Sequence, residues 1–164
     1  MRAYDSRPVP GDALGRVLEA GRISPSASNI QPWHFIVVKD PDKRKALSGG
    51  RYAKFLAESP VVIIGCGNTK ASPKWYPVDV SIALQQMVIA ATAEGLGTCW
   101  IGSFAEDEVR KAANIPRDYS VVAMLALGYP KEKFDLSAKL SRSKSRKPLE
   151  QIVSYEEFGG SKRD

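Results

Sequence analysis

The segment at residues 24–38 constrains the fold of this chain most, because it joins a polar, proline-containing stretch directly to an apolar one. Residues 24–32 read Ser-Pro-Ser-Ala-Ser-Asn-Ile-Gln-Pro. Hydroxyl and amide side chains at this density compete with regular backbone pairing, so the sequence predicts a shaped loop there instead of a helix. The apolar residues that follow predict a strand over residues 35–39, which enters a sheet directly from the loop.

Hydrophobic periodicity predicts the remaining elements. Helices are expected over residues 12–21, 40–50, 51–58, 77–95 and 105–113, and strands over residues 61–66, 98–101 and 121–127. Residues 67–76 are polar and contain Pro73, which predicts a surface loop. The helix from Pro77 is apolar around nearly its whole circumference, and such a helix is normally buried in a core or between subunits.

The positive charge of the chain is concentrated near its C-terminus. The formal net charge is +6, and residues 131–147 hold seven Lys and Arg against two acidic residues, a local net charge of +5. We therefore expect a single domain over residues 1–164, in which residues 131–164 form a basic extension that wraps over the surface. Phe134 is the one aromatic residue between positions 131 and 147, too few for a platform that stacks nucleic-acid bases. Nucleic acid is therefore not an expected partner.

The sequence lacks the motifs of several common kinds of site. Cys66 and Cys99 lie on separate expected strands without a Cys-x-x-Cys pattern, so we expect reduced core thiols and no metal site. The single histidine, His34, stands at the entry to a strand, where a packed or surface role is a better interpretation than a catalytic triad. No signal-peptide core and no run of ~20 apolar residues occurs. We expect a cytoplasmic protein without membrane contact.

Three segments of the sequence resemble signatures of the nitroreductase family, flavin enzymes that carry FMN at the interface of a homodimer. Residues 25–35 read Pro-Ser-Ala-Ser-Asn-x-Gln-Pro-Trp-x-Phe, residues 94–102 read Glu-Gly-Leu-Gly-Thr-Cys-Trp-Ile-Gly, and residues 144–149 read Lys-Ser-Arg-Lys-Pro-Leu. They occur in the order that the family shows, across nearly the whole chain. The resemblance implies an α+β fold of the nitroreductase type, with a mixed, largely antiparallel sheet sandwiched between helices in a homodimer.

The resemblance also implies which residues bind FMN. Lys144 and Arg146 match the segment that reaches the phosphate, although composition alone favours a solvated basic tail. Ile101 and Gly102 match the position whose backbone N–H groups face the flavin N5. A further match is a loop that touches the flavin bound mainly by the other subunit, namely Pro25, Ser26, Ala27, Ser28 and Asn29. The last two matches are cations, Lys54 and Arg2. Without the resemblance, these segments read as a strand end, a self-capping surface loop and exposed cations.

The N-terminus departs from the family pattern. The flavin site of the family usually opens with Arg-Arg-Ser-x-Arg-x-Phe/Tyr, and Arg2-Ala3-Tyr4 matches only its last three positions. The missing residues would hold phosphate and ribityl oxygens, so FMN affinity is expected to be lower without them. We expect the natural chain to start about 15 to 20 residues upstream, a length of about four or five helical turns. The alternative is a short variant that binds flavin weakly.

These observations predict an FMN-dependent oxidoreductase of the nitroreductase type, which passes hydride from NAD(P)H through the flavin to a nitroaromatic, quinone or similar acceptor. Because the cofactor carries the chemistry, no catalytic acid or base is assigned. Two alternatives stay open. One is a flavin-fragmenting or dehalogenating branch of the same fold, and the other is a non-catalytic binding module with a basic tail.

Overall fold

The structure, a computed structural model, describes residues 1–50, 53–131 and 146–160. The chain divides into two units, Met1–Glu132 and Lys133–Asp164. Lys144 and most of the expected basic extension therefore lie outside the described residues.

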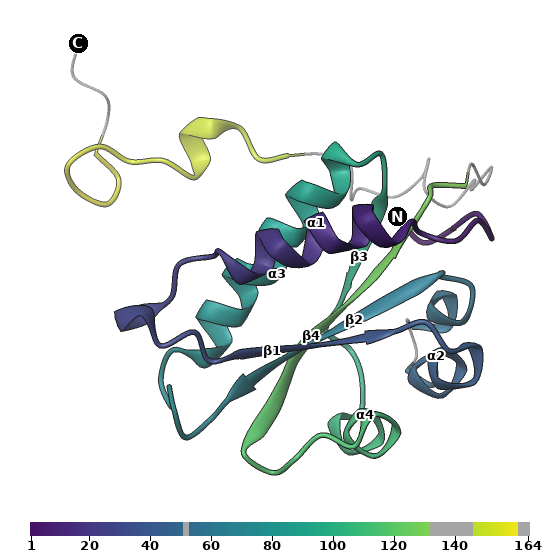
Figure 1. Ribbon diagram of the computed structural model, residues 1–164. Helices are drawn as coiled ribbons and strands as arrows, with labels where there is room; N and C mark the ends of the chain where they lie inside the picture. The colour runs from purple at the N-terminus through teal and green to yellow at the C-terminus, as the bar shows by residue number, and fades with distance from the viewer. Residues whose placement is uncertain (51–52, 132–145, 161–164) are drawn as a thin grey trace. The chain divides into compact units, whose positions relative to one another are not determined.

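A four-stranded sheet forms the centre of the first unit (Figure 1). Its strands are β1 (Trp33–Val38), β2 (Val61–Asn68), β3 (Gly97–Ile101) and β4 (Tyr119–Gly128), in the order β1-β2-β4-β3. Each pair of neighbouring strands is antiparallel. The largely antiparallel sheet is thus confirmed, and the described strands contain no parallel pair.

Helices cover both faces of this sheet. The helices α1 (Gly11–Arg22) and α3 (Tyr76–Ala93) pack together on one face, and α2 (Pro41–Leu47) and α4 (Glu106–Ala113) lie on the other (Figure 1). This is the α+β arrangement that the sequence predicts. In the part of the chain that the structure describes, no helix is long and apolar enough to cross a membrane.

Side-chain alternation along the central strands explains how one sheet supports two cores. Val62 and Ile64 of β2 belong to the apolar cluster on the α2/α4 face, whereas Val61 and Ile63 belong to the cluster on the α1/α3 face. All four are at most 1% exposed. Because both faces of the strand are covered, it reads in the sequence as a continuous apolar run.

Some element boundaries differ from the sequence prediction. The strand β1 begins at Trp33 because this residue already pairs with Gly67, and the same pairing extends β2 into the expected loop. The predicted helix over residues 51–58 is wrong in its described part, which forms only a 3-10 turn, η2 (Lys54–Ala57). A short helix depends on its caps and packing, and this segment lacks the side-chain cap that Asp40 gives to α2.

Leu84 of α3 fills the space beside β2. Its side chain is fully buried, and a Cβ added at Gly65 would lie 2.7 Å from its Cδ1. Leu84→Ala should lower the free energy of unfolding by about 3 kcal/mol, because apolar burial is lost and a cavity remains. Urea denaturation measures this change. The control Gln86→Ala, at an exposed position of the same helix, should alter it by less than about 0.5 kcal/mol, and an equally small effect of Leu84→Ala would contradict this packing.

Candidate functional site

The aromatic side chain of Phe55 has one cation over its ring and a second cation next to it in the sequence. The guanidinium carbon of Arg2 is 5.9 Å from the centroid of the Phe55 ring, and Lys54 immediately precedes Phe55 in η2. Arg2 and Lys54 are both exposed. We call Arg2, Lys54 and the Phe55 ring the cationic corner. It exposes positive charge to solvent beside an apolar surface.

Tyr4 attaches the corner to the core. Its ring stacks on Phe55 at 6.4 Å with 27° between the ring planes, and its hydroxyl donates a hydrogen bond to the Met1 carbonyl oxygen at 3.3 Å. Burial raises the pKa of Tyr4 well above its usual value, and the neighbouring Cys99 raises it further. Tyr4 therefore stays neutral and acts as a support. This aromatic support was not predicted from the sequence, although an aromatic residue stands close to each predicted cation in the sequence.

The end of β3 lies in the same apolar cluster. Ile101 is 4% exposed and shares this cluster with Tyr4 and Phe55. The pairing of β3 with β4 ends at Ile101↔Met124, so Gly102 lies beyond the strand ladder. A Cβ added at Gly102 would meet no atom of the described residues within 4 Å. The backbone at Gly102 is therefore open to the close approach of a flat molecule.

Residues 25–31 form the shaped loop that the sequence predicts. The loop contains one 3-10 turn, η1 (Ala27–Asn29), and three residues with positive φ, namely Ser28, Asn29 and Gln31. The carbonyl oxygen of Ser26 accepts a hydrogen bond from the Asn29 N–H at 3.0 Å, and its hydroxyl oxygen accepts one from the Gln31 N–H at 2.9 Å. The loop thus caps itself, as its composition predicts.

The predicted cofactor residues of the first unit fall into two groups. Arg2, Lys54, Ile101 and Gly102 lie around the apolar cluster on the α2/α4 face. The loop at residues 25–29 follows the far end of α1 (Figure 1) and is hydrogen-bonded to α3, which covers the opposite face. The structure therefore does not bring the two groups together within one chain.

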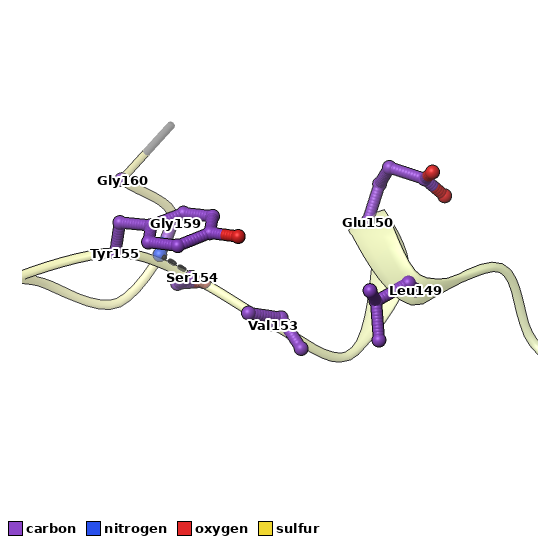
Figure 2. A pocket seen from close by; sticks show the side chains of 7 residues that line it. All are labelled: Leu149, Glu150, Val153, Ser154, Tyr155, Gly159 and Gly160. Carbon is purple, nitrogen blue, oxygen red and sulfur yellow. Dashed lines mark hydrogen bonds between the residues drawn. The ribbon is translucent and has the colours of Figure 1, made fainter. Parts of the chain in front are cut away.

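The second unit has a hollow of its own, which Figure 2 shows. Its volume is about 470 Å³, and Leu149, Val153 and Tyr155 line it. The loop that closes it is held by the Gly159 N–H, which donates to the Ser154 hydroxyl oxygen at 3.0 Å. Leu149 and Tyr155 remain 64% and 43% exposed. Arg146 is also exposed in this unit.

A smaller hollow of about 290 Å³ contains His34 and Cys66. The His34 ring meets the Tyr119 ring edge-on at 5.8 Å, which agrees with the packed or surface role predicted for it. Cys66 is 1% exposed, and burial raises its pKa to about 11. Its thiol is therefore protonated at neutral pH and is a poor nucleophile. Both cysteines are free, and the described residues contain no group of three acidic, Cys or His side chains that could hold a metal.

Comparisons with known proteins extend over most of the chain. The model of the Nitroreductase family matches residues 1–50 and 48–129. A protein of Archaeoglobus fulgidus, provisionally named an NADH dehydrogenase/NAD(P)H nitroreductase, is 32% identical over 82% of this chain and 82% of its own length. A Thermus thermophilus protein named NADH dehydrogenase is 27% identical over 94% of this chain and 90% of its own.

Solved structures share the same fold. A structure described as an FMN-dependent nitroreductase from Clostridium difficile superposes with a TM-score of 0.81 at 26% identity, over 96% of this chain and 94% of that one. Together with the architecture described above, these matches indicate that the chain is an oxidoreductase. The chain belongs to the Nitroreductase family, whose model covers the four strands and the four α-helices of the described residues.

Proposed function

We propose that two copies of this chain bind FMN between them and use it to pass hydride from NAD(P)H to a small acceptor such as a nitroaromatic or a quinone. The observation that carries the proposal is the separation of the two groups of matched residues in one chain. Residues 25–29 are bonded to α3, while Arg2, Lys54 and Gly102 lie on the other side of the sheet. In a two-fold dimer each copy can present its loop to the other copy's cationic corner, which completes two equal sites.

The cationic corner fits FMN in charge and in shape. The FMN phosphate is an anion, and Arg2 and Lys54 supply exposed positive charge. Arg146 of the second unit is a further proposed phosphate ligand, together with Lys144. The open backbone at Gly102 admits a flat ring, and the neighbouring apolar cluster excludes water from one of its sides.

When bound, FMN supplies the acceptance and donation of hydride. The residues of the chain then bind, orient and desolvate the cofactor, and none of them has to move a proton. The cationic corner agrees with a role without proton transfer, because its supporting tyrosine, Tyr4, is buried and neutral. It also agrees with the protonated, buried thiol of Cys66.

The outer face of α3 supports a homodimer. Val78 and Ile89 are 46% and 58% exposed, and Val78 lines a shallow hollow with Pro77 and Ile82. The inner face of this helix is already packed, so an apolar outer face indicates contact with another chain. The second unit also exposes large apolar side chains, namely Leu149, Ile152 and Phe158.

An FMN titration tests the proposed function. The purified protein should quench FMN fluorescence as it binds one FMN per chain, and added salt should weaken binding because cations hold the phosphate. NADH or NADPH should then bleach the bound flavin, and nitroaromatics or quinones should restore its absorbance.

A protein that does not bind FMN at saturating concentration contradicts the proposal, and binding of oligonucleotides by such a protein would favour the binding module. Turnover restricted to halogenated acceptors, or fragmentation of the flavin, would place the chain in one of the other flavin branches.

A further inference from the structure

The buried carboxylate of Asp79 has no function in the site described so far. Asp79 lies in the first turn of α3 and is 2% exposed. Its Oδ2 atom is buried and has no hydrogen-bond partner among the residues that the structure describes. Burial of a carboxylate oxygen without a partner is costly. The positive end of the helix dipole lies at this turn and offsets part of the cost, because it attracts negative charge.

The second carboxylate oxygen of Asp79 holds the loop at residues 25–31. Its Oδ1 accepts a hydrogen bond from the backbone N–H of Ala27 at 3.0 Å, across 52 positions of the sequence. Among the hydrogen bonds of the described residues, this is the one that joins the loop to another element. The others close within the loop itself.

A single anchor has a large effect on this loop because its backbone is strained. Ser28, Asn29 and Gln31 have φ values of 51°, 54° and 54°, and such conformations persist only where the surroundings impose them. A hydrogen bond to an ionised oxygen is stronger than one to a neutral oxygen. The carboxylate therefore suits a site where one bond has to set the direction of a whole loop.

We propose that Asp79 is a positioning residue for flavin binding: its carboxylate fixes residues 25–29 in the orientation in which they reach the FMN held by the second copy. The inference rests on the proposed function and deepens it. It gives the buried carboxylate of α3 a role in the geometry of the neighbouring subunit's cofactor site. Asp79 itself touches neither the cofactor nor the acceptor.

Three variants test the hydrogen bond from both of its ends. Asp79→Leu removes the acceptor and should weaken FMN binding about ten-fold or more. Asp79→Asn keeps an oxygen that can accept from Ala27 and should recover most of this loss. Ala27→Pro removes the donor, and the extended backbone of Ser26, with φ −141° and ψ 157°, tolerates a following proline. Both changes break the same hydrogen bond. The double variant Asp79→Leu/Ala27→Pro should therefore have an FMN affinity no lower than that of the single variant that binds FMN less tightly.

Ser72→Ala is the matched control. Ser72 is 3% exposed, its hydroxyl is also buried without a partner, and it lies just before the same helix. Its removal should leave FMN affinity unchanged. The dissociation constant and the visible circular dichroism of bound FMN are measured well below the Tm of each variant. If Asp79→Leu lowers the Tm but keeps the wild-type affinity and spectrum, the positioning role is wrong and the proposed function stands. If the wild-type protein does not bind FMN, both fail.

Discussion

Ile89→Glu should convert a dimeric, FMN-binding protein into a monomer that retains almost no FMN. Ile89 is 58% exposed on the outer face of α3, where we propose that the second copy packs. In a two-fold dimer this substitution places two like charges in one apolar interface. Each buried, unpaired carboxylate costs several kcal/mol, so the dimer dissociation constant should rise by at least about 1,000-fold. FMN binding should be lost with the dimer because each proposed site uses both copies.

Sedimentation velocity and an FMN titration measure this result. The far-UV circular dichroism of the variant should match that of the wild type, because the changed side chain is exposed in the single chain. Lys111→Glu, at an exposed position of α4 on the other face of the sheet, is the control and should stay dimeric. A dimeric Ile89→Glu protein with wild-type FMN affinity would show that the interface lies elsewhere.

Gly102→Val should abolish most FMN binding without changing the stability of the protein. A Cβ at Gly102 would meet no atom within 4 Å in the part of the chain that the structure describes, so the free energy of unfolding should change by no more than about 0.5 kcal/mol. If a flavin edge approaches this backbone, the added methyl groups occupy its place. Overpacking of this kind typically costs about 1–3 kcal/mol, which corresponds to roughly five-fold to one-hundred-and-forty-fold weaker binding.

The same substitution at another open glycine is the control. A Cβ at Gly11 also meets nothing within 4 Å, and Gly11 lies at the start of α1 outside the proposed site. Gly11→Val should bind FMN as the wild type does. Equal FMN affinity of Gly102→Val and the wild type would mean that the ring does not approach β3, and the assignment of Ile101 and Gly102 would be wrong.

The elements that could be predicted from the sequence are those whose local pattern has one physical interpretation. The apolar run at residues 61–66 has both faces buried, and the structure makes it the strand β2. The polar, proline-bounded segment at residues 24–32 could only be a shaped loop, and it is one. The segment at residues 51–58 has helical composition but is too short to support a helix on its own, so the tertiary context decided its conformation.

The candidate site could be predicted only in part, because its contacts join residues that are distant in the sequence. The motifs indicated Arg2, Lys54 and Gly102 individually. They did not indicate that Tyr4 stacks on Phe55 or that Arg2 lies over the Phe55 ring, since no sequence period links these positions. Nor could a pattern pair Asp79 with Ala27 across 52 residues. Such a pairing depends on how α3 packs beside the loop.

Native mass spectrometry of the purified protein after incubation with FMN tests whether one cofactor site is built from two copies of the chain. We expect a dimer that carries two FMN molecules and a monomer peak without FMN. A monomer that retains FMN, or a protein that retains none at all, would contradict it.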